Sequence, residues 1–246
     1  MVISKIAART APVLAFAAVF GLSGCGNMNV DFDGDGVPLA ELDMSASAPT
    51  GVVLAGADAV VISAGSEFAI DVDGSVEASA RMRFARDDGN LVIHREVGDW
   101  TSSDGRATIH VTMPAPESLV MAGSGTMTTD AMANHSEIVI AGSGNLQADG
   151  IAAKEMDVTI AGSGSLEASG SVARLELDIA GSGSAAMTRL QVDDAEISVA
   201  GSGGAEFASD GNVEASIAGS GSVRVRGSAS CKSNSVGSGK LICEDA

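Results

Sequence analysis

The residues with the clearest potential for metal chemistry are three aspartates near the N-terminus, Asp31, Asp33 and Asp35, in the order Asp-Phe-Asp-Gly-Asp-Gly. Oxygen ligands at alternate positions, with Gly at the sixth, begin a calcium loop of the EF-hand type. The twelfth position is Leu42, where that loop needs a glutamate, and Glu41 is one residue out of place. The spacing excludes an EF-hand. We expect a solvated acidic tether, with a simpler calcium site as the alternative.

The other candidate bases and nucleophiles do not form a catalytic set. His94, His110 and His135 are far apart, although His94 and His110 would be neighbours if their strands paired. Zinc requires three or four ligands with supporting contacts, and no further ligand stands at a suitable spacing. The serine of Gly-Ser-Gly recurs seven times, which indicates a structural role rather than a nucleophile. We therefore predict no catalytic residue, no cofactor and no histidine metal site.

The N-terminal segment indicates a different chemistry, the attachment of lipid to a cysteine. Two basic residues precede an apolar stretch, residues 11–20, that is too short to span a bilayer. Leu-Ser-Gly-Cys follows at residues 22–25, and this order resembles a bacterial lipobox. The resemblance implies that residues 1–24 are a cleaved signal peptide and that Cys25 receives a diacylglyceryl group. An ordinary cleaved signal followed by a free thiol is the alternative.

Lipidation would anchor the protein to the cell envelope. Two or more acyl chains hold a protein on a membrane durably, whereas one chain is marginal. Residues 25–37, rich in Gly, Asn and Asp, would then be a tether between the lipid surface and the folded body. Gly26 stands where Asp would direct retention in the inner membrane. We expect the outer membrane of a Gram-negative bacterium, on its periplasmic or surface side.

Composition excludes several classes of protein. The chain has 246 residues and a net charge of −18, which disfavours binding to a nucleic-acid backbone. Hydrophobic residues make up 45% of the chain but aromatic residues only 3%, so a core must consist largely of Ala, Val, Ile and Leu. A disordered polymer lacks this much apolar material, and the chain is long enough to bury a core.

A repeat in the second half of the sequence predicts the fold. Gly-Ser-Gly recurs at intervals of 19, 20, 19, 20, 18 and 18 residues, with first glycines at Gly123, Gly142, Gly162, Gly181, Gly201, Gly219 and Gly237. Before each triplet, aliphatic residues alternate with polar ones, which is typical of a strand with one buried face. Such short units bury a core only by stacking. We therefore predict an all-β protein, a right-handed parallel β-helix with coils of about 19 residues.

The same alternation predicts how the corners and the last coil are built. Both glycines of each triplet fall on inward positions, and the serine between them points outward. In this register Cys231 takes the inward position of Val213, and Cys243 takes that of Ala168. An exported protein with two such cysteines favours a disulfide, which would staple the terminal coil. Two buried free thiols are the alternative.

Five arginines and the single tryptophan lie in the region before the repeats. The basic residues of this region are Arg81, Arg83, Arg86, Arg95 and Arg106. Nearby acidic residues are Asp87, Asp88, Glu96 and Asp104. We expect a solvated surface of paired charges, with contact to an anionic glycan as the alternative. Trp100 lies in a predicted loop, where we expect a packing role, with stacking on a sugar as the alternative.

The region before the repeats has less regular strand patterns. We interpret residues 38–116 as irregular opening turns of the same body, joined near Pro114 and Pro116 to the regular repeats of residues 117–246. A separate small β domain is the alternative.

The whole pattern is similar to that of a known family. It is carried by Leu42, residues 52–55 and 60–62, Gly65, Phe68, Ile70, Val72, residues 107–114 and the Ala-Gly-Ser-Gly repeats. Over roughly residues 39–243 the sequence resembles the bacterial putative auto-transporter adhesin head family, or GIN domain. The resemblance implies a right-handed β-helix on exported, often lipid-anchored proteins of Gram-negative bacteria, without an established molecular role.

These observations predict an exported, non-catalytic lipoprotein whose domain, residues 38–246, is a β-helical scaffold. Its expected roles are adhesion or binding to an envelope component. The expected partners are the membrane, through Cys25, and a glycan or protein ligand at the cell surface, but not nucleic acid. An enzyme acting on extracellular or periplasmic polysaccharide is the alternative, because pectin-lyase-type enzymes share the predicted fold and the arginines could hold an anionic substrate.

Overall fold

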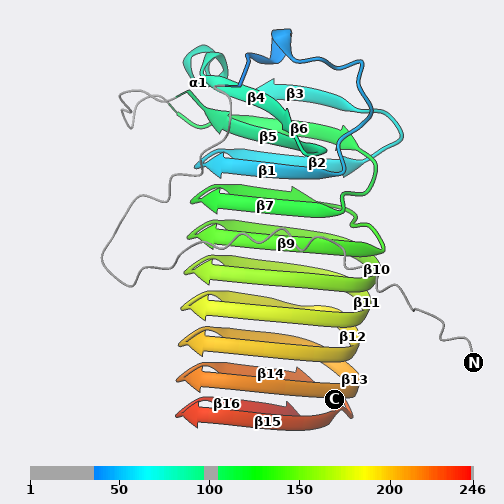
Figure 1. Ribbon diagram of the computed structural model, residues 1–246, viewed down its shortest axis with the longest axis vertical. Coiled ribbons are helices and arrows are strands. Elements are labelled where there is room, and N and C mark those ends of the chain that lie inside the picture. The colour runs from blue at the N-terminus through cyan, green and yellow to red at the C-terminus, as the bar shows by residue number, and fades with distance from the viewer. Residues whose placement is uncertain (1–35, 97–104, 245–246) are drawn as a thin grey trace, which may run out of the picture. The chain divides into compact units, whose positions relative to one another are not determined.

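The computed structural model describes residues 36–96 and 105–244, and these residues form one nearly all-β body (Figure 1). Strands account for 70% of the residues and helices for 4%. The body is a parallel β-solenoid of about seven turns, roughly 19 residues apart. The solenoid that we predicted from the glycine repeat is therefore confirmed.

The body is built from short opening elements followed by longer strands. The opening elements are η1 (Leu39–Glu41), β1 (Gly51–Gly56), β2 (Ala59–Ala64), β3 (Ala69–Asp73), α1 (Val76–Ala80), β4 (Met82–Asp87), β5 (Asn90–Arg95) and β6 (Thr108–Met113). The regular coils begin with β7 (Ser118–Gly123), β8 (Thr126–Thr129), β9 (His135–Gly142) and β10 (Asn145–Gly162). They continue with β11 (Ser165–Gly181), β12 (Ser184–Gly201), β13 (Gly204–Gly219), β14 (Ser222–Arg226), β15 (Ser230–Gly237) and β16 (Lys240–Glu244).

Two walls of stacked strands enclose the core. The first wall contains β5, β1, β7, β9, the second halves of β10–β13, and β15. The second wall contains β6, β2, β8, the first halves of β10–β13, β14 and β16. Inward residues stack in register, as in the buried column of Val158, Leu177 and Ile197. Each coil thus covers the apolar residues of the next, which a single coil could not do alone.

The opening coils do not stack in the order of the chain. β1 pairs with β5 on one side and with β7 on the other, and β2 lies in the same way between β6 and β8. β1 and β2 come first in the sequence but form the second coil of the stack. The chain then continues through β3, α1 and β4 at the N-terminal end of the solenoid, and β5 and β6 form the coil next to β1 and β2 on that side. The link that carries the chain past the β1–β2 coil to β7 contains Pro114 and Pro116.

The N-terminal end of the solenoid is closed by elements that break the parallel pattern. β3 pairs antiparallel with β6, and β4 pairs antiparallel with β5. The short helix α1 begins after Ser75, whose hydroxyl accepts a hydrogen bond from the Ala78 N–H at 3.1 Å. Ala78 itself is fully buried. Such a cover removes an exposed strand edge, which would otherwise invite pairing with another chain.

The two glycines of each corner serve different purposes. Gly164 is buried, and a Cβ there would lie 2.5 Å from Cγ2 of the core residue Ile140. Gly162 is instead exposed at the bend with φ of +120°, and a Cβ there would lie 2.5 Å from the Gly142 carbonyl oxygen of the neighbouring coil. Our expectation that both glycines lie on the inward side was therefore wrong for the first one, because the chain turns at that residue.

In the last coil, β15 has Cys and Ser at inward positions that are aliphatic in the preceding coil. Val213 is followed in its column by Cys231, Ala215 by Ser233, and Ile217 by Ser235. The Sγ atoms of Cys231 and Cys243 are bonded, which joins β15 of the first wall to β16 of the second. Cys231 is half-buried and Cys243 is exposed, because no further coil covers them in the described part of the chain.

Candidate interaction surface

The most regular surface of the body is the outer face of the first wall from β9 to β15, which we call the acidic face. In-register pairing arranges its outward side chains in columns along the stack. One column consists of Glu137, Asp157, Glu176, Glu196, Glu214 and Lys232. The next consists of Val139, Thr159, Asp178, Ser198, Ser216 and Asn234. The third consists of Ala141, Ala161, Ala180, Ala200, Ala218 and Val236.

Stacked carboxylates change the electrostatics of the acidic face. Partial burial, followed by repulsion from Glu155 and Asp178, raises the pKa of Asp157. Partial burial, followed by repulsion from neighbours that include Asp157, likewise raises the pKa of Glu176. Neighbouring strands are only about 4.8 Å apart, so like charges in successive coils are close enough to disfavour one another. The face therefore holds a concentrated negative charge that a cationic or hydrogen-bonding partner could relieve.

The end of the acidic column is neutralised by a lysine. Lys232 Nζ donates a hydrogen bond of 2.8 Å to Glu214 Oε1. This bond and the charge of Glu214 raise the pKa of Lys232.

A shallow groove of about 390 Å³ runs beside the acidic column. Its lining comes mostly from the second and third columns, Thr159 to Asn234 and Ala180 to Val236. Val236 at one end is 74% exposed, which is unusual for an aliphatic residue. The groove contains no histidine, cysteine or basic residue among its lining. Its small side chains can contact an extended ligand but offer no nucleophile paired with a base.

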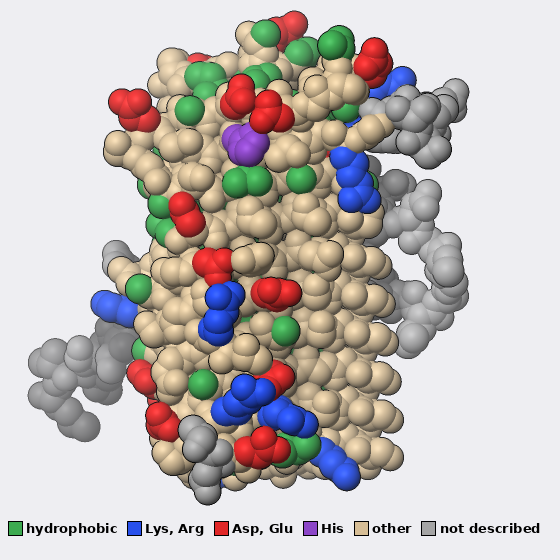
Figure 2. All heavy atoms as spheres, turned by 180° about the vertical axis from the view of Figure 1, so that it is seen from behind, with side chains coloured by type: hydrophobic (Ala, Val, Ile, Leu, Met, Phe, Trp, Pro, Cys, Tyr) green, Lys and Arg blue, Asp and Glu red, His purple; other side chains and the backbone are tan. Residues whose placement is uncertain are grey.

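The corners of the second wall are fastened by polar contacts between coils. Ser169 Oγ donates to Asp149 Oδ1 at 2.5 Å, and Arg226 pairs with Glu206 at 2.5 Å. The hydrogen bond from Ser169 lowers the pKa of Asp149, and hydrogen bonds from Ser228 lower that of Asp210. The face seen in Figure 2 carries both signs of charge among small and uncharged groups.

The arginines before the repeats, which we expected on a solvated surface of paired charges, have different partners in the structure. Arg83 Nη2 pairs with Glu96 Oε2 at 2.5 Å. The guanidinium carbon of Arg86 lies 4.7 Å from the ring centre of Phe68, and Arg86 Nη1 donates a hydrogen bond to the Ser47 carbonyl oxygen. Arg95 is only 8% exposed, so the expectation of a solvated surface was wrong for this residue.

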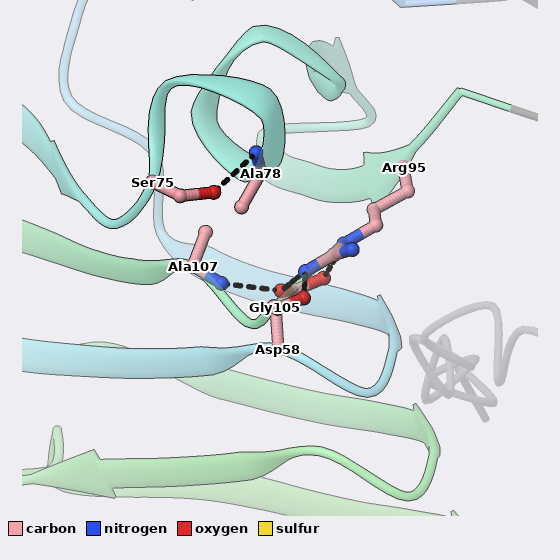
Figure 3. Close-up of polar contacts among 6 residues, drawn as sticks. All are labelled: Asp58, Ser75, Ala78, Arg95, Gly105 and Ala107. Atoms are coloured by element: carbon pink, nitrogen blue, oxygen red, sulfur yellow. Dashed lines mark hydrogen bonds and ion pairs between the residues drawn. The ribbon is translucent and has the colours of Figure 1, made fainter. Parts of the chain in front are cut away.

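Arg95 instead forms a buried ion pair with Asp58, which is 2% exposed (Figure 3). Its Nε donates to Asp58 Oδ2 at 2.6 Å, and its Nη2 donates to Asp58 Oδ1 and to the Gly105 carbonyl oxygen. The Ala107 N–H donates a further bond of 2.8 Å to Asp58 Oδ1. The carboxylate thereby ties the β1–β2 corner to β5 and to the segment before β6.

Sequence reasoning missed Asp58, although a signal was present. Gly56 pairs with Gly123 and Ala59 with Thr126, so Asp58 stands where Gly125 stands in the next coil. The corner Gly56-Ala57-Asp58 therefore corresponds to a Gly-Ser-Gly triplet in which alanine replaces the serine and aspartate replaces the second glycine. A charged residue at an inward corner position predicts a buried partner.

The three histidines are separate in the structure. His94 Nδ1 lies 3.0 Å from the Arg95 carbonyl oxygen, His110 Nε2 lies 3.3 Å from Asp73 Oδ2, and His135 Nε2 lies 3.5 Å from Glu155 Oε2. β5 and β6 belong to different walls, so His94 and His110 are not cross-strand neighbours. Within residues 36–96 and 105–244, no three His, Cys, Asp or Glu side chains form a group suited to a metal ion.

Several predicted residues lie outside the described ranges. They are the lipidation site Cys25, the aspartates Asp31, Asp33 and Asp35, and Trp100. The signal peptide and most of the tether lie outside them as well. Among the helices of the described part, none has the length and apolar character needed to cross a membrane.

The fold is shared with solved bacterial proteins of low sequence identity. A putative adhesin from Bacteroides fragilis superposes with a TM-score of 0.71 at 16% identity, covering 80% of this chain and 92% of the other. A putative lipid binding protein from Parabacteroides distasonis gives 0.64 at 20% identity, covering 81% and 93%. A putative adhesin from Parabacteroides merdae gives 0.59 at 14% identity, covering 82% and 93%.

Sequence comparison gives a more direct assignment. No curated protein matches the chain significantly. A family model described as "Putative auto-transporter adhesin, head GIN domain" matches residues 48–229, which is most of the chain. The protein therefore belongs to this GIN-domain family, as its sequence pattern led us to expect.

Proposed function

We propose that the protein is a non-catalytic lipoprotein of the bacterial envelope that presents its acidic face for adhesion or for contact with an envelope component. The observation that carries the proposal is the register of that face. Outward residues repeat from β9 to β15 in straight columns beside a shallow groove. A flat periodic surface suits an extended, periodic ligand, because successive units of the ligand meet the same groups in successive coils.

The N-terminal sequence and the family support the proposed location. The lipobox-like segment ending at Cys25 would supply a membrane anchor, and residues 25–37 would act as a spacer that lifts the solenoid from the lipid surface. The family's description as an adhesin head is consistent with a role outside the cytoplasm. We expect attachment to the outer membrane.

The polysaccharide-enzyme alternative has less support. It was motivated by fold analogy and by the arginines of the first half. Arg95 is engaged with a buried carboxylate, and Arg83 with Glu96, so neither is available as a basic group above a substrate groove. The groove of the acidic face has no acid–base pair suited to glycoside hydrolysis, which needs two carboxyl groups held on either side of the scissile bond.

The location is tested by protease treatment of intact cells that produce the chain or its Cys25→Ser variant. We expect the unchanged chain to fractionate with the outer membrane and the variant to lose acylation, measured by mass spectrometry of the N-terminal peptide. Loss of the protein after protease treatment of intact cells would place it on the outer surface. An unacylated Cys25 in the unchanged chain would contradict the anchor.

Binding is tested with the chain displayed on beads against a glycan array and against bacterial and host cells. Glu176→Lys reverses a charge on the acidic face, and Glu167→Lys makes the same change on the second wall of the same strand, β11. We expect Glu176→Lys to change binding at least fivefold and Glu167→Lys to leave it unchanged. Equal effects of the two variants, or no binding to any surface, would argue against the proposal.

A further inference from the structure

The two ends of the solenoid are built differently. Antiparallel strands β3 and β4 and helix α1 close the N-terminal end. At the other end β15 pairs only with β13 and β16 only with β14, within residues 36–96 and 105–244 (Figure 1). One edge of each strand therefore has no strand partner in the described body. Unpaired edges are templates for pairing with another chain, and proteins usually protect them.

β15 carries features that protect its edge. Its inward positions include Ser233 and Ser235, which offer little apolar surface. Its outward Lys232 is held by Glu214, so that the charge remains at the edge. Lysine at an edge strand disfavours pairing with a further strand.

β16 has a different pattern. Its five residues are Lys240-Leu241-Ile242-Cys243-Glu244, with two half-buried aliphatic residues between opposite charges. Neither Lys240 nor Glu244 has an ion-pair partner within the described residues. β16 is held extended by its parallel pairing with β14, and the disulfide at Cys243 ties it to β15.

The sequence of β16 is complementary to itself in the antiparallel direction. If two copies pair about Ile242, that residue lies opposite its own equivalent, and Lys240 lies opposite Glu244 of the second copy. The inward Leu241 then lies opposite the inward Cys243. Cross-strand pairs of aliphatic residues and of opposite charges are favourable, and the two-fold axis makes the Lys240–Glu244 and Leu241–Cys243 contacts twice.

We propose that β16 is a self-association edge, through which two copies of this protein join tail to tail by antiparallel pairing centred on Ile242. The resulting pair would present two solenoids end to end, with the acidic faces of both continuing in one rod. The pairing depends on strand register and charge alone, and so it does not require the proposed adhesive function.

Charge reversal tests the pairing in the full chain, extracted in detergent and measured by sedimentation equilibrium. We expect the unchanged protein to dimerise, and Lys240→Glu and Glu244→Lys each to weaken dimerisation at least tenfold, because each places like charges opposite one another. A mixture of the two variants, and the double variant with both changes, should recover dimers. Lys154→Glu, the same change at an exposed lysine of a distant coil, is the matched control.

A zero-length carbodiimide cross-link adds a direct measurement. Lys240 and Glu244 of one strand are about 13 Å apart, at roughly 3.3 Å per residue, so this reagent can join them only between two copies. We expect the Lys240–Glu244 cross-linked peptide in the unchanged protein. A monomer at all concentrations, dimers unaffected by the single reversals, or a mixture that stays monomeric would overturn the proposal.

Discussion

The Asp58 carboxylate occupies the corner position that belongs to the second glycine in the later coils, and it accepts hydrogen bonds from both Nε and Nη2 of Arg95. Both side chains are buried, at 2% and 8% exposure. Arg95 ends β5, so this pair joins the β1–β2 coil to the coil above it in the stack. In the opening coils, which do not stack in chain order, the Asp58–Arg95 ion pair thus takes the place of the close glycine packing found at the corners of the later coils.

Removing one member of this pair should destabilise the body strongly. Asp58→Ala leaves a buried guanidinium without its carboxylate, and such losses typically cost about 3–5 kcal/mol. The free energy of unfolding, measured by urea denaturation, should fall by an amount in this range. The double variant Asp58→Ala with Arg95→Met should be more stable than Asp58→Ala alone, because no unpaired charge remains. A loss below about 1 kcal/mol for the single variant would show that the pair is unimportant.

The first glycine of a corner should tolerate no side chain. Gly162→Ala places a Cβ 2.5 Å from the Gly142 carbonyl oxygen at a φ of +120°, so the backbone of two coils must shift. We expect the midpoint of urea unfolding to fall, with a cost of at least about 1–3 kcal/mol. Ser163→Ala, an exposed neighbour in the same corner, should change stability by less than about 0.5 kcal/mol. Equal midpoints for the two variants would contradict the packing argument.

The carboxylates of the acidic face should oppose folding at neutral pH. A raised pKa means that the folded state binds a proton more tightly than the unfolded state, so stability is lost as pH rises through the raised pKa of Glu176. Glu176→Gln should therefore stabilise the protein at pH 7, by less than about 1 kcal/mol because the group is near water. The gain should vanish in acid, where both states are protonated. Thermal unfolding at several pH values measures this.

Asp210 supplies a control of opposite sign for that experiment. Its pKa is lowered by hydrogen bonds from the Ser228 N–H and hydroxyl, both at 2.9 Å, so it contributes stability above its unfolded pKa that is lost as pH falls. Asp210→Ala should destabilise the protein at pH 7 and have a smaller effect in acid. The same pH dependence for Asp210→Ala and Glu176→Gln would show that these carboxylates do not act through their shifted pKa values.

Reduction of the Cys231–Cys243 disulfide should loosen only the last coil. The inward positions of β15 are polar, so this coil has little apolar burial to hold it once the cross-link is broken. A disulfide of this kind typically contributes about 2–4 kcal/mol. Hydrogen exchange should accelerate in β15 and β16 and remain unchanged in β11, where the inward residues are aliphatic. Faster exchange throughout the body would instead indicate that the staple supports the whole solenoid.

Much of the regular body could be predicted from the sequence. The period of the Gly-Ser-Gly triplets and the alternation between them placed Val213 and Cys231 in one inward column, and the structure pairs these residues. This succeeded because each coil contacts chiefly its neighbours in the stack, so that a local pattern repeated in sequence becomes a contact repeated in space.

Tertiary structure alone decided the rest. The position of β1 between β5 and β7, and the meeting of Asp58 with Arg95, depend on contacts between segments whose patterns do not repeat. The acidic face likewise emerges only when Asp157, Glu176 and Glu196 are stacked, although each alone resembles an ordinary solvated residue. Periodicity determines which residues point inward, because alternation is a local property of strands. Which strand lies beside which, where the repeat is broken, is determined by three-dimensional packing and by the pairing of buried charges.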